Sequence, residues 1–176
     1  MSSNLHFRIA TTDDAPRIQD LIHAAFRFTD ASIDWIGSPE LANTFEIPLE
    51  VILNRITGLD NVFLVASSIP DGPIIGCVNV FKKTPDFGRL ALLAIDPTLQ
   101  RSGLGKNMLV VGEEHLTREF GVEKIGLNAL HTRKGLLKWY EKQGYVKTGA
   151  ITELPIDRAP EIQEKVLLVE LEKSFV

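Results

Sequence analysis

The sequence predicts one α/β domain (α+β in some schemes), in which a mixed central β-sheet is flanked by helices. Three observations carry this prediction. The chain has 176 residues, and residues 1–176 are expected to form a single domain with a sizeable core. Strand-like runs follow one another at residues 62–68, 73–81 and 89–95, and a turn-forming IPDG joins the first two. A strand–helix–strand pattern then spans residues 90–130, which requires one parallel pair.

The amino-terminal part is predicted to contain a strand and two helices. Residues 5–10 alternate between apolar and polar side chains, which predicts the strand. Thr12 suits a helix N-cap, and Asp13 and Asp14 suit the first turn because their charges complement the helix dipole. Five apolar residues follow at helical spacing: Ile18, Leu21, Ile22, Ala25 and Phe26. A second helix is predicted over residues 48–56.

The second half of the chain is predicted to alternate between helices and strands. Residues 103–120 read as a helix that ends at Gly121, a residue favoured just after a helix. The remaining elements are a strand at 124–130, a helix at 133–143 ended by Gly144, and strands at 145–151 and 165–171. The predicted order is therefore β-α-α-β-β-β-α-β-α-β-β, with the parallel pair near the middle. Ligands of such sheets lie at the carboxyl ends of the parallel strands.

The charge and hydropathy of the chain make nucleic-acid and membrane partners unexpected. The chain carries 19 Lys and Arg against 23 Asp and Glu, a formal net charge of −4, whereas nucleic acid favours a basic face. No apolar run reaches the roughly 18 residues needed to span a bilayer. The first residues lack the apolar core of a signal peptide. The predicted location is therefore cytoplasmic, and a nuclear pool stays possible.

Cysteine and histidine give no metal site. Cys77 is the single cysteine, so neither an internal disulfide nor a thiolate cluster can form. It is either a nucleophile or, as the apolar run around it favours, a small buried strand residue. The histidines are far apart and form no HExxH pair; they are His6, His23, His115 and His131.

The segment LQRSGLGKNML, residues 99–109, has the chemistry of an anion site. It follows a strand and opens a helix, where unpaired N–H groups and the helix dipole favour negative charge. Gly103 and Gly105 let a ligand approach the backbone closely, and Arg101 and Lys106 add positive charge. The pattern matches neither GxxxxGK[ST] nor GxGxxG. Taken alone, it is also compatible with a glycine pair that opens a helix without a ligand, although the anion site is favoured.

Two blocks of the sequence resemble one protein family. QRSGLG, residues 100–105, resembles the acyl-CoA signature Q/R-x-x-G-x-G/A of the GCN5-related N-acetyltransferases (GNAT). LLKWYEKQGYVKTG, residues 136–149, resembles the later motif of that family, a helix with Tyr and Glu-Lys that breaks at Gly before an aromatic residue. The order of elements also agrees with the GNAT fold. The resemblance is strong over residues 89–149 and weak before 62 and after 151.

The resemblance implies that acetyl-CoA is the co-substrate, with no metal. It implies that a strand backbone pairs with the pantetheine arm and that loop amides hold the pyrophosphate. The family commonly has Asn where this chain has Arg133, so Arg133 is expected to reach a phosphate or a backbone carbonyl without inheriting the Asn role. The predicted binding residues are Leu93, Ala94, Ile95, Gln100, Arg101, Ser102, Gly103, Leu104, Gly105, Lys106 and Arg133.

Tyr140 and Asn128 are the predicted catalytic residues. Leu136, Leu137 and Tyr140 share a helix face, so the ring should point inward, and the resemblance implies that its hydroxyl lies near the CoA sulfur. Proton transfer from a tyrosine of pKa about 10 to a thiolate of pKa about 8.5 is uphill by roughly 2 kcal/mol. The alternative is a core tyrosine that only positions CoA. Asn128 either holds a water or orients the substrate, or is a satisfied core amide.

The proton acceptor is expected to be a chain of water molecules. Some family members carry a glutamate early in the strand before the CoA loop, but this chain has Arg89 there. The changed residues at 89 and 133 keep a second function open, a catalytically inactive acyl-CoA-binding module that acts as a sensor or complex subunit. The presence of Tyr140, a predicted catalytic residue, argues against an inactive module. A protein that binds ATP or NAD instead is supported only by the two glycines.

The acceptor is predicted to be a primary amine of a small molecule or peptide, and the protein a monomer or homodimer. Aromatic and acidic residues that can hold an amine are Phe26, Phe28, Asp30, Asp34, Trp35, Glu40, Phe45 and Glu46, and in the last loop Glu153, Asp157, Glu161 and Glu164. The alternative is a solvated acidic surface with the aromatic residues in the core.

Overall fold

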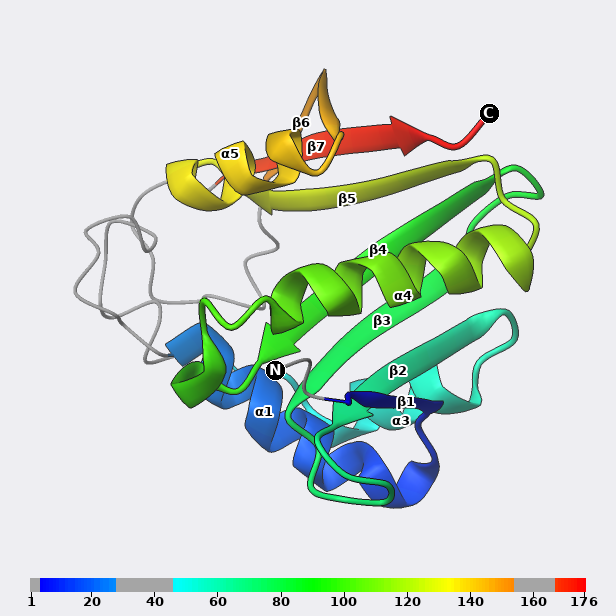
Figure 1. Ribbon diagram of the computed structural model, residues 1–176. Coiled ribbons are helices and arrows are strands. Elements are labelled where there is room, and N and C mark those ends of the chain that lie inside the picture. The colour runs from blue at the N-terminus through cyan, green and yellow to red at the C-terminus, as the bar shows by residue number, and fades with distance from the viewer. Residues whose placement is uncertain (1–3, 28–45, 154–166) are drawn as a thin grey trace.

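A computed structural model of the chain describes residues 4–27, 46–153 and 167–176. These residues form a seven-stranded sheet in the order β1-β2-β3-β4-β5-β7-β6 (Figure 1). The strands are β1 (His6–Ile9), β2 (Asn61–Ser67), β3 (Gly76–Lys82), β4 (Phe87–Ile95), β5 (Lys124–Leu130), β6 (Val146–Glu153) and β7 (Leu167–Ser174). The helices are α1 (Ala15–Arg27), α3 (Leu49–Thr57), α4 (Leu104–Arg118) and α5 (Lys134–Lys142), with short 3-10 turns η1 (Thr12–Asp14) and η2 (Pro97–Leu99).

The predicted fold class is confirmed, and the order of the described elements agrees with the predicted one. β4 and β5 form the predicted parallel pair in the middle of the sheet, and the other neighbouring strands are antiparallel. Two strand boundaries were wrong by three residues. β3 begins at Gly76 instead of residue 73, and β7 ends at Ser174 instead of residue 171, because Ser174 still pairs with Lys124 of β5.

The start of α1 also differs from the prediction. Thr11, not Thr12, is the N-cap, and it precedes the short turn η1. The carboxylate of Asp14 accepts a hydrogen bond from the backbone N–H of Thr11 at 2.8 Å and two from Arg8 of β1, at 2.7 and 2.9 Å. The Asp14 carboxylate therefore accepts from the backbone of the N-cap residue, as in a capping box. Its bonds with Arg8 also connect the start of the helix to the edge strand of the sheet.

Two hydrophobic clusters pack on opposite faces of the sheet. α4 and α5 cover one face, where Met108, Leu116 and Leu137 lie among the buried residues. α1 and α3 cover the other face, where Ile18, Leu21, Ile22 and Ile52 are buried. The alternation of strand side chains supplies both clusters, since successive residues of β2 and β3 point to opposite faces. The molecule is thus a three-layer sandwich with the sheet in the middle.

Cys77 is a buried residue of β3, as the apolar run around it favours. Burial raises the pKa of its thiol to about 12. The thiolate is the reactive form of cysteine, so both the burial and the raised pKa argue against a nucleophilic role for Cys77 at neutral pH.

The sheet opens where β4 and β5 separate. These strands pair over Phe87–Arg89 and Lys124–Gly126 alone, although β4 continues to Ile95 and β5 to Leu130. β4 has a bulge against β3, where Leu92 adopts a left-handed φ of 51°. A bulge bends its strand and increases the local twist. We call the opening between residues 90–95 of β4 and 127–130 of β5 the fork; Figure 1 shows it widening toward the amino-terminal end of α4.

Candidate functional site

The chain turns from β4 into α4 through two left-handed residues. Arg101 has φ 64° and Gly103 has φ 86°. The first backbone hydrogen bond of the helix runs from Asn107 N–H to Gly103 O, at 3.1 Å. The N–H groups of Gly105 and Lys106 consequently have no partner among the described residues. A helix start of this kind attracts an anion, because free N–H groups and the positive end of the dipole coincide.

The loop has room and charge for such an anion. A side chain on Gly103 would meet nothing within 4 Å, and one on Gly105 would meet only Ile95 Cγ1, at 3.9 Å. Arg101 and Lys106 are exposed and form no ion pair within the described ranges. The predicted binding residues of the loop are therefore contiguous around an open, positively charged turn, which fits a pyrophosphate.

The predicted pantetheine residues line the fork. Leu93, Ala94 and Ile95 are the last residues of β4, and Ala94 and Ile95 pair with β3. On the β5 side they pair with no strand, because the β4–β5 ladder ends at Arg89. A strand edge without a partner can receive an extended ligand by backbone hydrogen bonding, and this edge leads directly to the α4 loop.

Tyr140 is buried on α5 with 8% of its surface exposed. Its ring makes edge contacts with Trp139 and Tyr145, at centroid distances of 5.0 and 5.9 Å. Its hydroxyl has no hydrogen-bond partner among the described residues. Burial raises the pKa of Tyr140 to about 12, and the positive charge of Arg133 acts in the opposite direction. The ring points inward, as helix periodicity predicts, and its hydroxyl is available to a ligand.

Arg133 and Thr132 lie where β5 meets α5. Arg133 is the N-cap residue of α5, and burial lowers the pKa of its guanidinium while Tyr140 opposes the shift. Among the solvent-inaccessible side-chain oxygens and nitrogens of the described ranges, Thr132 Oγ1 alone has no hydrogen-bond partner. A sealed hydroxyl without a partner is costly, so Thr132 is a candidate contact for a bound molecule. No sequence motif pointed to it.

Asn128 lies on the opposite face of the sheet from Tyr140. Its β5 neighbours Leu127 and Ala129 are buried in the α4 cluster, as is Tyr140, so the alternation of β5 turns Asn128 toward the α1 face. Its side chain is exposed and has no hydrogen bond to another described residue. The reading of Asn128 as a satisfied core amide is wrong. The two predicted catalytic side chains do not touch, and only a molecule in the fork could meet both.

Sequence reasoning missed a carboxylate on this second face. Glu170 of β7 lies opposite Asn128 in the β5–β7 register and forms a two-pronged ion pair with Arg89 of β4. Arg89 stands on β4 where some family members carry a glutamate, but in the folded chain the carboxylate of Glu170 lies beside it. The two residues are 81 positions apart, so no motif spacing connects them.

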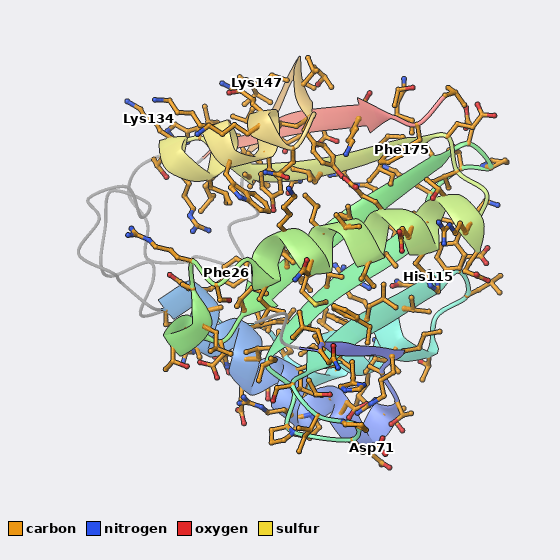
Figure 2. All side chains as sticks on the ribbon, in the orientation of Figure 1. Phe26, Asp71, His115, Lys134, Lys147 and Phe175 are labelled. Carbon is orange, nitrogen blue, oxygen red and sulfur yellow. The ribbon has the colours of Figure 1, made fainter. Side chains whose placement is uncertain are left out.

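Most predicted acceptor residues lie outside the described residues; they are Phe28, Asp30, Asp34, Trp35, Glu40, Phe45, Asp157, Glu161 and Glu164. Of the others, Glu46 and Glu153 are exposed and Phe26 packs at the edge of the α1 cluster. Figure 2 shows Phe26, at the end of α1, and Lys134, at the start of α5, toward the end of the molecule where α4 begins. His115 and Phe175 lie toward the other end.

Two further findings concern metals and membranes. No group of three or more His, Cys, Asp or Glu within residues 4–27, 46–153 and 167–176 is arranged to hold a metal ion. No helix in these ranges is both long and apolar enough to cross a membrane.

Comparison with known sequences decides the family. A sequence model of the acetyltransferase (GNAT) family matches residues 31–145, more than half of the chain. The chain belongs to the GNAT family. The match includes the α4 loop, Tyr140 and both strands of the fork. None of the curated proteins compared with this GNAT chain matches it in sequence.

Solved structures of other GNAT proteins share the fold. The ribosomal-protein-S18-alanine N-acetyltransferase of Escherichia coli is 17% identical with a TM-score of 0.70, over 97% of this chain and 94% of that one. The PaiA N-acetyltransferase of Thermoplasma acidophilum, in complex with coenzyme A, is 18% identical with a TM-score of 0.64, over 97% and 99%. A GNAT acetyltransferase of Elizabethkingia anophelis with acetyl-CoA bound is 18% identical with a TM-score of 0.64, over 97% and 98%. At these identities the similarity concerns the fold.

Proposed function

We propose that this GNAT protein transfers the acetyl group of acetyl-CoA directly to a primary amine of a small molecule or peptide. The observation that carries the proposal is the continuous path from the unpaired edge of β4 to the free N–H groups at the start of α4. Acetyl-CoA supplies a thioester-activated acetyl group. The neighbours with coenzyme A or acetyl-CoA bound support this choice of co-substrate.

The chain offers a separate group for each part of the co-substrate. The amides of residues 101–106 and the charges of Arg101 and Lys106 would hold the pyrophosphate. The backbone of residues 93–95 would pair with the amides of the pantetheine arm. Thr132 Oγ1 and the guanidinium of Arg133 would meet polar groups of the ligand at the start of α5, where a bond to Thr132 would satisfy its sealed hydroxyl.

Tyr140 would stabilise the leaving sulfur as a hydrogen-bond donor. With the pKa of Tyr140 at about 12 and that of a thiol near 8.5, complete proton transfer is uphill by about 5 kcal/mol. This is more than the roughly 2 kcal/mol expected for an unperturbed tyrosine. Donating from Oη without full transfer avoids that cost while stabilising the charge that develops on the sulfur.

The acceptor amine would approach from the α1 face of the fork. Asn128 presents an exposed, unbonded amide there, which can orient an amine or hold the water that receives its proton. Direct attack needs no nucleophilic side chain, consistent with a protonated Cys77. The Escherichia coli neighbour is named for an alanine of ribosomal protein S18, so peptides belong among the acceptors to be tried beside small amines.

A thiol-release assay tests the proposal. The protein is incubated with acetyl-CoA and a panel of polyamines, amino acids, aminoglycosides and peptides, and free thiol and acetylated product are measured. We expect thiol release that depends on one class of amine. Binding of acetyl-CoA without acceptor-dependent release across the panel would favour the inactive acyl-CoA-binding module. Binding of ATP or NAD in preference to coenzyme A would contradict both.

Gly103→Ala should weaken binding of coenzyme A about tenfold. An alanine at φ 86° costs about 1–2 kcal/mol, and the loop will relax away from the shape that exposes its amides. Gly121→Ala is the matched control, since Gly121 also has a left-handed φ, 69°, but follows the far end of α4, away from the loop; it should change the dissociation constant less than about threefold. Titration calorimetry with coenzyme A measures both. Equal affinities for the two variants would contradict a loop held by Gly103.

A further inference from the structure

An ion pair joins two strands that are not neighbours. Arg89 of β4 and Glu170 of β7 are separated by β5 in the sheet. Arg89 Nη1 donates to Glu170 Oε1, and Nη2 donates to Oε2 at 3.2 Å. Their side chains are 15% and 18% exposed, so solvent screens this pair less than a surface pair. The two-pronged geometry fixes direction as well as distance.

The pair crosses β5 at a residue without a side chain. Arg89 lies opposite Gly126 in the β4–β5 register. A Cβ on Gly126 would lie 3.1 Å from Glu170 Oε1 and 2.5 Å from Phe87 Cζ. Any other residue at 126 would push apart the groups that meet above it. Because Gly126 has no side chain, the space above it is open, and the Glu170 carboxylate of β7 reaches Arg89 of β4 through this space.

The crossing point coincides with the base of the fork. Arg89 and Gly126 form the last backbone pair between β4 and β5, and only three such pairs join the two halves of the sheet there. On one side lie β1 to β4, and on the other β5, β7 and β6. An electrostatic bridge at the last pair resists both sliding and further opening of the strands.

We propose that Arg89 and Glu170 form a clamp that fixes the opening of the fork and thereby the affinity of the chain for acyl-CoA. Both are positioning residues. Both oxygens of Glu170 accept from the guanidinium, so the carboxylate is committed to the clamp instead of receiving a proton from the acceptor. The ligand part of this inference rests on the proposed function, whereas the mechanical part does not.

Three variants and a control test the clamp. Arg89→Met and Glu170→Gln each break the charge pair, and the double variant Arg89→Glu with Glu170→Arg exchanges its partners. The control is Glu172→Gln, which removes the ion pair of Glu172 with Lys124, 3.7 Å apart on the same face. That pair joins the neighbouring strands β5 and β7 and does not cross the fork.

Two measurements are made on each variant. Hydrogen–deuterium exchange follows the amides of Phe87–Arg89 and Lys124–Gly126, and calorimetry gives the dissociation constant for coenzyme A. We expect both single variants to exchange faster at these amides and to bind coenzyme A at least about fivefold more weakly. The exchanged double variant should recover most of both losses, and Glu172→Gln should leave both unchanged. If Arg89→Met fails to fold, the results for Glu170→Gln and the double variant test the clamp.

Several results would overturn the clamp. Unchanged exchange and unchanged affinity in both single variants would do so. Loss of turnover in Glu170→Gln beside a normal Arg89→Met, measured in the thiol-release assay, would show that Glu170 acts on the acceptor by itself. A wild-type protein that binds no coenzyme A would refute the proposed function, and the exchange data alone would then support or overturn the clamp.

Discussion

Tyr140→Phe is expected to lower kcat at least about a hundredfold, the usual scale for losing a positioned proton donor. The KM for acetyl-CoA should change less than about threefold, because the ring and its contacts with Trp139 and Tyr145 stay in place. The hydroxyl that is lost has no partner among the described residues, so its removal should cost little stability. Steady-state kinetics with the acceptor identified in the thiol-release assay measure the effect.

The matched control is Tyr145→Phe, the same chemical change on the neighbouring buried ring. Tyr145 donates its hydroxyl to Glu113 at 2.9 Å, so this variant should lose stability but keep kcat within about twofold. A kcat for Tyr140→Phe within threefold of the wild type would contradict the role of its hydroxyl. So would an equal loss of kcat in both variants, which would reflect packing.

The pH dependence of Tyr140 gives a second check. Burial raises its pKa from the ordinary value near 10 to about 12. The phenol should stay protonated through the whole neutral and mildly alkaline range, so any fall in kcat below pH about 10 must come from another group. Because the folded pKa is the higher one, its contribution to stability is complete below pH about 10 and is lost as the pH rises toward 12.

Lys173→Met is expected to lower the free energy of unfolding by about 3 kcal/mol. Lys173 Nζ lies 3.1 Å from Oε1 of Glu113, a carboxylate of α4 that is only 7% exposed. Without the ammonium group, the carboxylate keeps the neutral hydroxyl of Tyr145 as its partner. Lys173 also lies over the rings of Tyr145 and Phe175, at 5.6 and 5.0 Å, and loses these contacts as well. Urea unfolding with an unchanged m-value measures the loss.

The double variant Glu113→Leu with Lys173→Met separates the cost of an unpaired charge from the worth of the pair. It should be more stable than Lys173→Met alone, because no buried charge is left without a partner. A loss below about 1 kcal/mol in Lys173→Met would contradict the argument. An equally unstable double variant would show that packing, not charge, is responsible.

These two charged contacts hold the halves of the sheet from opposite faces. Glu113 of α4 reaches Lys173 of β7 on one face, and Arg89 of β4 reaches Glu170 of β7 on the other. Lys173 and Glu170 are three residues apart on β7, so their side chains point to opposite faces. The backbone ladder between β4 and β5 is short, and this makes the side-chain bridges important to the geometry of the fork.

Helix and loop features were predictable because their signals are local. The buried residues of α1 follow the 3.6-residue period, and the inward ring of Tyr140 follows the period of α5. Of the two left-handed residues that turn the chain into α4, Gly103 is a glycine of the loop signature. Strand ends were less predictable, since Ser174 of β7 is held by Lys124 of a strand far earlier in the chain. The N-cap is Thr11 instead of the predicted Thr12, because Asp14 bonds to Thr11 and to the side chain of Arg8 in β1.

The sequence by itself determined the fold class, the order of the elements and the glycine loop before α4, because each depends on periodicity or on turn chemistry within a few residues. Only the tertiary structure decided which faces Tyr140, Asn128 and Glu170 occupy, because that depends on strand register. A slip of one residue between β5 and β7 would turn Glu170 to the other face and remove it from Arg89. Arg89 and Glu170 are 81 residues apart in the sequence. They can form their ion pair only after β7 has paired with β5 in the native register.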